Sequence, residues 1–309
     1  MSSRRRVLIL GLPYFGRMLE EILRERGWQA TFVPHPGRDI RGWARLLPLV
    51  ARADLVYLIS SRIDRGCPQD WLLRFRRRPV VVHWNGTDVL IAADEYRRGN
   101  ASRRIAERAI HWCDAPWLVD ELAAIGVKGE HVPLPIPVLS GEAPPLPARF
   151  RALLYLPVDA FDREVFDMET LLRLPRECPE VGFTLIPSPG ESLPTPLPPN
   201  LEAPGWVTDM DALYAETTVL VRLTSHDGTS FMVLEALSRG RHVIWTYPMT
   251  GVIQASGFEA VSGALRELIA RQAAGRLGLN DEGRRYALEQ FDRAHLIEEL
   301  DRRLRAVVA

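Results

Sequence analysis

Two carboxylates and a polar turn make the stretch VRLTSHDGTSFMVLEALSRGRHVIW, residues 221–245, a candidate for chemistry. The apolar run before the turn predicts a buried strand, and residues 229–239 predict a helix. The segment DGTS would then lie where a strand ends and a helix begins, and free backbone N–H groups and the helix dipole favour an anion there. Gly228 would let the backbone approach a ligand closely, and Thr229 or Ser230 can cap the helix.

Asp227 and Glu235 are the two carboxylates of this stretch. Asp227 would repel a phosphate placed directly against it, but it can accept hydrogen bonds from hydroxyls beside that phosphate. Glu235 lies eight residues later, about 80° beyond two full helical turns, so the spacing predicts that both side chains share one broad face. Hydroxyls on either side of a diphosphate would satisfy both carboxylates, as in a nucleotide sugar. The alternative is that Asp227 caps the helix and Glu235 is solvated.

Composition limits the class of protein. The chain has 309 residues, enough for about two domains, and 47% apolar and 25% charged residues are ordinary for a globular protein. No apolar run reaches the roughly 18 residues of a membrane-spanning helix, and the first run, VLILGL, is typical of a buried strand rather than of a signal peptide. The widely spaced Cys67, Cys113 and Cys178 predict free thiols in a reducing compartment, so we expect a cytoplasmic protein.

Charge is uneven although the net charge is zero. Residues 1–150 hold 23 lysines and arginines against 16 acids, a net of +7, and residues 151–309 have a net of −7. The basic half can attract anionic lipid or a phosphorylated partner, whereas the neutral chain does not indicate nucleic-acid binding. The stretch WLLRFRRRPVV is a basic, apolar patch, and our hypothesis is that it contacts anionic lipid or a lipid-linked acceptor. The alternative is a helix with an apolar core face and a solvated basic end. The patch contains Arg74, Arg76, Arg77 and Arg78 with Trp71, Leu72, Leu73 and Phe75.

Strand-like apolar runs alternate with helix-like stretches along the whole chain. The first half has RVLILGL, ATFVP, ADLVYLIS and PVVVHW, followed by a helix over 100–112. The second has RALLYLP, a helix near 164–174, VGFTLIPS, a helix near 209–216, TVLVRLT and RHVIWTY. Such near-continuous apolar strands predict an α/β fold with two Rossmann-like domains, each a parallel sheet covered on both faces. Ligands are expected beyond the carboxyl ends of the strands, in a central cleft.

A proline-rich segment, VLSGEAPPLPARF, is typical of a linker and divides the series into two. We predict a first domain over 1–138, the linker over 139–150 and a second domain over 151–285. A separate C-terminal helix is predicted over 286–309.

The stretch HDGTSFMVLEALSRGRHVIW resembles the donor-site signature of retaining glycosyltransferases with the two-domain GT-B fold, the glycosyltransferase group 1 (GT4-like) family. That signature has two acids separated by seven residues, and the second acid is the first residue of the pattern E-A-x-x-x-G-x-x-V-I. Asp227 stands where Glu is more usual. The resemblance implies that Asp227 contacts the donor sugar and that Glu235 contacts the ribose.

Other stretches resemble the same family in the same order. PGWVTDMDALYAETTVLVRLT is similar to its nucleobase segment, which implies that Trp206 and Val207 lie near the base. VVVHWNGTDVL resembles the strand whose histidine, here His83, lies in the cleft. The family's segment that enters the hinge resembles APWLVDELAAIGVKGEHVPLPIPV of this chain. Its C-terminal helix, which crosses back to the first domain, resembles ALEQFDRAHLIEELDRRL.

The chain departs from the family where an arginine and, six residues later, a lysine usually grip the donor diphosphate. Pro157 stands at the arginine position and Arg163 at the lysine position. A guanidinium can bind phosphate as a fork, and Arg222, at the end of a predicted strand, is a second candidate. The alternatives are a surface arginine at 163 and, at 222, an arginine paired with a neighbouring acid.

Further candidates lie in the first half. His83 ends a strand and could polarise an acceptor or bind the donor sugar; the alternative is a structural histidine. In NGTDV, Asn85 and Asp88 are candidates for the acceptor side, although Asp88 could simply cap a helix. Gly11 and Gly16 flank a strand-to-helix turn that the family often brings close to the donor phosphate. No Lys-Ser/Thr follows, which excludes a P-loop.

The resemblance implies an enzyme that transfers a sugar, with retention and without a metal ion or cofactor. The donor would be a nucleotide sugar, UDP- or GDP-linked, bound by the second domain, and the acceptor a glycan, a lipid-linked or a small molecule bound by the first. His83 and Asp227 are the expected catalytic residues. Two alternatives remain: a non-catalytic GT-B-like partner subunit that binds a nucleotide sugar or glycan, and a nucleotide-sugar epimerase.

Overall fold

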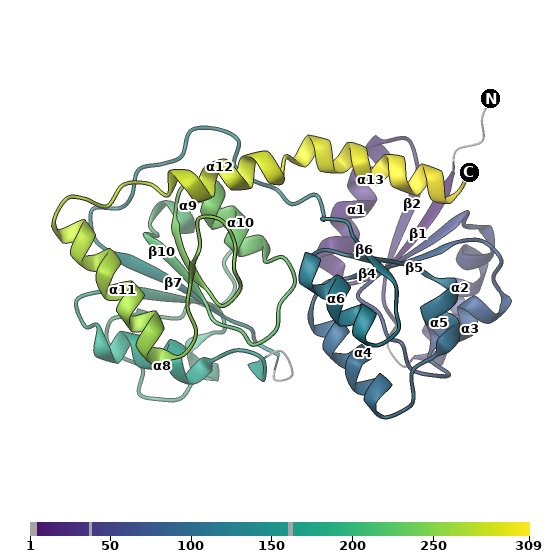
Figure 1. Ribbon diagram of the computed structural model, residues 1–309, viewed down its shortest axis with the longest axis horizontal. Helices are drawn as coiled ribbons and strands as arrows, with labels where there is room; N and C mark the ends of the chain where they lie inside the picture. Colours follow the sequence, from purple (N-terminus) through teal and green to yellow (C-terminus); the bar gives the residue numbers. More distant parts are fainter. Residues whose placement is uncertain (1–4, 37–38, 160–162) are drawn as a thin grey trace. The chain divides into compact units, whose positions relative to one another are not determined.

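The computed structural model describes residues 5–36, 39–159 and 163–309. The chain forms two compact units, which we call the N-terminal unit and the C-terminal unit. The N-terminal unit contains Met1–Pro135, Asp227–Thr229 and Ala294–Ala309, and the C-terminal unit contains Ile136–His226 and Ser230–Arg293. Each is built on one six-stranded sheet with helices packed against it, as Figure 1 shows.

The sheet of the N-terminal unit has the order β2-β1-β3-β4-β5-β6, and all its strand pairs are parallel. Its central strands β3 and β4 are buried at every position, which explains their continuous apolar sequences. The strands are β1 (Arg6–Gly11), β2 (Gln29–Pro34), β3 (Leu55–Ile59), β4 (Val80–Trp84), β5 (Ile110–Cys113) and β6 (Gly129–His131). The helices are α1 (Pro13–Glu25), α2 (Ile40–Arg52), α3 (Pro68–Phe75), α4 (Thr87–Arg97), α5 (Arg103–Arg108), α6 (Pro116–Ala124) and α13 (Arg293–Val307).

The sheet of the C-terminal unit has the order β12-β11-β10-β7-β8-β9 and is also parallel. In Figure 1, α8 and α11 lie on one face of this sheet and α9 and α10 on the other. The strands are β7 (Arg151–Leu156), β8 (Gly182–Pro187), β9 (Leu201–Glu202), β10 (Val219–Arg222), β11 (His242–Trp245) and β12 (Ile253–Gln254). The helices are α8 (Met168–Glu177), the 3-10 turn η1 (Gly190–Ser192), α9 (Met210–Ala215), α10 (Phe231–Ser238), α11 (Phe258–Ala273) and α12 (Asp281–Gln290).

The predicted α/β fold class, with two parallel sheets, is confirmed. Several predicted helix bounds were wrong. The helix expected over 100–112 is the six-residue α5 followed by strand β5, and the one expected near 164–174 is α8, which begins at Met168. The single helix expected over 286–309 is two helices, because the chain leaves helical geometry at the buried Phe291.

The last helix, α13, is held in the N-terminal unit by a buried aspartate. Asp301 is 5% exposed and accepts a hydrogen bond of 2.7 Å from the indole Nε1 of Trp28. Arg305 donates to both carboxylate oxygens at 3.0 Å, and Arg26 lies 3.4 Å away. Burial alone would raise the pKa of Asp301, but the hydrogen bonds from Arg305 and Trp28 outweigh it, and the pKa is lowered.

None of the helices in the described parts of the chain is both long and apolar enough to cross a membrane. Within the same residues, no group of histidine, cysteine, aspartate and glutamate side chains could hold a metal ion. Cys67, Cys113 and Cys178 are free and buried.

Candidate functional site

Arg163 is held at the carboxyl edge of the C-terminal sheet by four hydrogen bonds to neutral oxygens. Its Nε donates to the carbonyl of Pro157, just after β7, at 2.7 Å. Its Nη2 donates to the hydroxyls of Ser188 and Ser192 at 2.7 and 2.9 Å, and Nη1 to the Ser192 carbonyl at 3.2 Å. Ser188 follows β8, so the guanidinium bridges the ends of two adjacent strands. These bonds fix its orientation without involving a carboxylate, which suits binding of an anion.

Arg222, the last residue of β10, supplies a second guanidinium to the same unit. It is 9% exposed and stacks over the rings of Tyr155 and Phe166, with its Cζ atom 4.5 and 5.1 Å from their centroids. Because β10 pairs with β7, Arg222 lies on the strand adjacent to the one that ends beside Arg163. The aromatic contacts favour the cation and restrict its side-chain rotamers.

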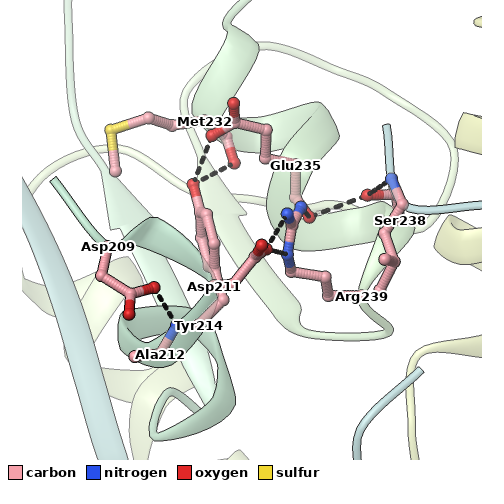
Figure 2. A network of polar contacts seen from close by, with 9 residues as sticks. Asp209, Asp211, Ala212, Tyr214, Met232, Glu235, Ser238 and Arg239 are labelled. Atoms are coloured by element: carbon pink, nitrogen blue, oxygen red, sulfur yellow. Dashed lines mark hydrogen bonds and ion pairs between the residues drawn. The ribbon is translucent and has the colours of Figure 1, made fainter. Parts of the chain in front are cut away.

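Glu235 belongs to a polar network on α10 that Figure 2 shows. The Tyr214 hydroxyl lies 3.1 Å from Oε2 of Glu235 and 3.2 Å from the Met232 carbonyl. Arg239 donates to the Glu235 carbonyl at 3.0 Å and pairs with Asp211. Burial raises the pKa of Glu235, whereas the Tyr214 hydrogen bond and the charge of Arg239 lower it. The network orients a partly buried carboxylate whose second oxygen can accept hydrogen bonds from a ligand.

Trp206 and Val207 lie in the loop between β9 and α9. Trp206 is 77% exposed, and Val207 is half-buried. Gly205, with φ +82°, takes a backbone conformation that other residues rarely adopt. An indole so exposed offers a flat apolar face to a ligand of the C-terminal unit.

The turn at Asp227 differs from the sequence-based expectation. The helix α10 begins at Phe231 with Ser230 as its cap, and the Ser230 hydroxyl accepts from the Val233 N–H at 3.4 Å. Asp227 therefore lies outside the helix, and the prediction that it shares a helical face with Glu235 was wrong. Its alternative role as the helix cap was also wrong.

Asp227, Gly228 and Thr229 belong to the N-terminal unit, where they pack against the ends of β4 and β5. The Thr229 hydroxyl donates to the Asp114 carbonyl at 2.6 Å, and its N–H lies 3.4 Å from that residue's carboxyl Oδ1. The Trp117 indole donates to the Asp227 carbonyl at 2.7 Å. A Cβ on Gly228 would meet the Asn85 carbonyl oxygen at 2.3 Å. The Thr229 N–H expected to be free is thus directed at Asp114, and Gly228 is required by close backbone packing.

A group of acids lies around this turn. Asp88 is 4% exposed and accepts hydrogen bonds from the backbone N–H groups of Asn85 and Gly86 at 3.0 to 3.3 Å. Burial raises the pKa of Asp88 to about 6, although these hydrogen bonds oppose the shift. Burial, followed by the charge of Asp88, raises the pKa of Asp114 well above its usual range. Asn85 links the two, with its amide nitrogen 3.5 Å from Asp114 Oδ2.

A pocket of about 700 Å³, which we call the β1–β3 pocket, lies at the carboxyl ends of β1, β2 and β3. Asp88 lines it, and so does Gly11, whose φ is +146° and whose Cβ would lie 2.0 Å from the Ile59 carbonyl oxygen. Ser60 also lines it and has φ 59°, a left-handed conformation that costs a serine about 1 kcal/mol and is typical of functional sites. Other polar lining residues are His35, Ser61, Arg62 and Asp64.

Two predicted site residues have structural surroundings. Gly16 lies in α1 where a Cβ would be 2.1 Å from the Phe32 ring, so the glycine permits packing of α1 on β2. His83 is fully buried, shares a hydrogen bond of 2.5 Å with the Tyr57 hydroxyl and contacts the Trp112 ring. Burial lowers the pKa of His83 to about 3, so its imidazole is neutral at pH 7. This environment favours the structural alternative for His83, and its catalytic role stays a prediction.

Four residues that the sequence did not single out contribute to these sites. Asp114 directly follows β5, and an acid at the end of a parallel strand could have been noticed. Tyr214, Ser188 and Ser60 gave no such signal, because their roles depend on partners or on a backbone angle that local sequence does not indicate.

Comparison with known proteins identifies the fold. No protein-family model matches the sequence, and no curated protein matches it. Sucrose-phosphate synthase (tll1590) from Thermosynechococcus elongatus superposes with a TM-score of 0.72 at 13% identity, over 98% of this chain and 99% of that one. It is a glycosyltransferase of the GT-B type. The chain has the GT-B fold.

Two further GT-B glycosyltransferases superpose over almost the whole chain. SnogD from Streptomyces nogalater has a TM-score of 0.54 at 17% identity, covering 99% of this chain and 100% of that one. CalG4, the calicheamicin glycosyltransferase, has a TM-score of 0.51 at 15% identity, covering 97% and 98%. At these identities a shared fold is established, and substrates must be inferred from the residues of this chain.

Proposed function

We propose that this protein is a glycosyltransferase that moves a sugar from a nucleotide-sugar donor, bound by the C-terminal unit, to an acceptor hydroxyl bound by the N-terminal unit. One observation carries the proposal: on a GT-B fold, Arg163 is hydrogen-bonded to residues that follow β7 and β8, and Arg222 ends β10, the strand beside β7. The helix α10 of the same unit bears the oriented carboxylate of Glu235. Two cations and a carboxylate suit a ligand that combines phosphates with hydroxyls.

The donor-binding roles follow from these groups. The two guanidinium groups would bind the diphosphate, Arg163 as a fork held by neutral oxygens and Arg222 as a cation restrained by aromatic rings. Glu235 would accept hydrogen bonds from the ribose hydroxyls, because Tyr214 occupies only one of its oxygens. Trp206, beside Val207, would stack on the base.

The acceptor roles belong to the N-terminal unit. The β1–β3 pocket would hold the acceptor, and Asp88 would accept a hydrogen bond from its hydroxyl. Asp227 would accept hydrogen bonds from hydroxyls of the donor sugar. His83, neutral and bonded to Tyr57, would support the end of β4 without exchanging a proton.

We expect retention at the anomeric carbon and no requirement for a metal ion. Arg163 and Arg222 would stabilise the negative charge that develops on the leaving diphosphate, the task that a divalent cation performs in other transferases. The departing diphosphate would take the proton of the attacking acceptor hydroxyl on the same face of the sugar. Activity should therefore survive a chelator.

The first experiment is a thermal-shift panel with UDP, GDP and their common sugar conjugates. A ligand at 100 times its dissociation constant should add about 2.7 kcal/mol to the free energy of unfolding. The expected result is stabilisation by one nucleotide family that is lost in Glu235→Gln and in Arg163→Met. Glu289→Gln, the same change at an exposed position of α12, is the matched control and should respond as wild type does.

Turnover then separates the alternatives. Release of the nucleoside diphosphate that depends on an added acceptor supports transfer, and NMR of the product's anomeric centre tests retention. Conversion of the donor sugar without an acceptor would indicate an epimerase. Donor binding without any turnover would indicate a non-catalytic partner subunit, and a chain that binds none of the nucleotides would contradict the proposal.

A further inference from the structure

An apolar groove lies between α2 and α3 of the N-terminal unit. It has a volume of about 1030 Å³, and we call it the α2–α3 groove. Three large apolar side chains on it are exposed: Leu47 by 65%, Trp71 by 51% and Phe75 by 74%. The groove is lined by Trp43, Ala44, Leu47, Val50, Ala51, Gly66, Pro68, Trp71, Leu72, Phe75, Arg76, Arg77 and Arg78.

These exposed side chains are not needed for the core of the unit. Leu46 and Leu73 on the same two helices are buried at 4% and 3%, so each helix already supplies the sheet with an apolar contact. Trp71 and Phe75 instead stack on each other outside it, with ring centroids 6.1 Å apart. Clustered apolar exposure of this kind indicates a surface that binds an apolar partner.

The surroundings of the groove are strongly basic. Residues 41–80 hold nine arginines and three aspartates, a net charge of +6. All three aspartates form ion pairs within the unit: Asp54 with Arg78, Asp64 with Arg62 and Asp70 with Arg104. The Arg74 guanidinium lies over the rings of Trp71 and Phe75, and Arg45 and Arg77 are exposed. The partner should therefore carry negative charge next to its apolar part.

The groove is continuous with the β1–β3 pocket. Trp43, Gly66 and Pro68 line both. The pocket is polar at its strand-end side, with Asp88 and Ser60, and the groove is apolar. A molecule that occupied both would have a polar head and a hydrocarbon tail.

We propose that the acceptor is a membrane lipid, with its head in the β1–β3 pocket, its chain in the α2–α3 groove and the surrounding arginines against an anionic bilayer. This inference rests on the proposed transferase function and narrows its acceptor to one class. The positive charge of this surface favours a lipid over a peptide or a second copy of the chain. The exposed apolar side chains lie among exposed arginines, and interfacial helices that bind anionic membranes have the same arrangement. A second copy would bring the same positive charge against itself.

Binding is tested on the full chain with vesicles of phosphatidylcholine alone and with about a third phosphatidylglycerol, by co-sedimentation. Monomeric lysophosphatidylglycerol, below its micelle concentration, is titrated calorimetrically as a probe for the groove itself. Wild type should bind the anionic vesicles and take up the monomeric lipid. Trp71→Ser/Phe75→Ser should weaken both at least ~10-fold, since each aromatic loses its burial against the chain. Arg74→Glu/Arg77→Glu should weaken vesicle binding by ~5-fold or more per charge.

Tyr96→Ser is the matched control, because Tyr96 is 48% exposed on α4 of the same unit and does not line the groove. It should bind as wild type does. Vesicle binding without uptake of the monomeric lipid would overturn the groove assignment, as would equal binding by wild type and Trp71→Ser/Phe75→Ser. Concentration-dependent dimerisation that Trp71→Ser/Phe75→Ser abolishes, without lipid binding, would overturn it in favour of a second copy.

The donor thermal shift, repeated on the same variants, separates this inference from the function on which it rests. Donor binding with no lipid binding refutes the lipid acceptor and leaves the transferase proposal intact. Lipid binding with no donor binding refutes the transferase proposal, and the acceptor role with it. The positive result is transfer of the donor's labelled sugar into a membrane lipid extract, at a rate that falls in Trp71→Ser/Phe75→Ser and is retained in Tyr96→Ser.

Discussion

Replacing Asp88 with asparagine should stabilise the N-terminal unit at neutral pH while it impairs acceptor use. The side chain is 4% exposed, and its Oδ1 accepts hydrogen bonds from the backbone N–H groups of Asn85 and Gly86, which an amide oxygen can also accept. Backbone hydrogen bonds from Ser61 and Val89 also favour the ionised carboxylate. The substitution keeps the shape and this acceptor atom and removes the charge, but it replaces Oδ2, which lies 3.3 Å from the Asn85 backbone nitrogen, with an amide donor. The charge is also what we propose binds the acceptor hydroxyl, so stability and activity should move in opposite directions.

The magnitude follows from the pKa of Asp88, which burial raises from 3.8 to about 6. Because the folded state holds the proton more tightly, the folded chain binds more protons between these two values, and stability falls as the pH rises through that window. A shift of about two units corresponds to about 3 kcal/mol once the group is ionised.

The assay is chemical unfolding of wild type and Asp88→Asn at about pH 4 and about pH 7.5, compared as the difference between the two proteins. We expect little difference at the acidic pH, and at the neutral pH a gain of about 1 to 3 kcal/mol, with part of the 3 kcal/mol offset by the weaker acceptor strength of a neutral amide. A variant that is less stable at both pH values would refute the reasoning, because the bonds from Asn85 and Gly86 would then outweigh the cost of burying the charge.

Three further substitutions test the other groups. Asp301→Asn should lower the free energy of unfolding by about 3 kcal/mol at pH 7, measured by denaturant titration. Folding lowers the pKa of Asp301, so this loss should disappear as the pH falls below the unfolded value of 3.8 and through the folded pKa. Tyr214→Phe should cost about 1 kcal/mol of stability and raise the pKa of Glu235 further, because it removes the hydrogen bond to that carboxylate. Calorimetry of this variant should then show weaker donor binding at mildly acidic pH than at neutral pH. Arg163→Lys should keep part of the donor affinity that Arg163→Met loses, because a lysine supplies the charge but not the fork that bridges two strand ends; equal affinities in both variants would show that the charge is irrelevant.

The sequence predicts the main strands of both units because buried parallel strands are continuous apolar runs. It does not predict β5, part of which fell in the helix expected over 100–112. It also does not predict β9 and β12, which have two residues each and pair along only part of their neighbours. Helix bounds were less predictable, since α8 and α2 contain an internal proline and their ends depend on capping side chains such as Asp167 and Asp39. Sheet order and the packing of α13 are set by contacts far apart in the chain, such as Trp28 with Asp301.

For the candidate site, position in the secondary structure was more predictable than geometry. Arg222 was expected to end a strand and is the last residue of β10. The relation of Asp227 to Glu235 was not predictable in this way, because the helix begins at Phe231, four residues after Asp227, and its cap is Ser230. The partners of Arg163, such as Ser188, lie 25 residues away and have no pattern that marks them.

The local charge at the strand ends is opposite to the charge of each half of the chain. The basic first half has acids, Asp88 and Asp114, at the carboxyl edge of its sheet, whereas the acidic second half has guanidinium groups there. The excess of positive charge in the first half is instead concentrated in residues 41–80, a stretch that includes α3 and nearly all of α2 and carries +6 of the +7. Net charge by halves therefore says little about the donor and acceptor sites. The net charge of the first half instead reflects the surface around the α2–α3 groove, and this groove connects that surface to the proposed acceptor pocket.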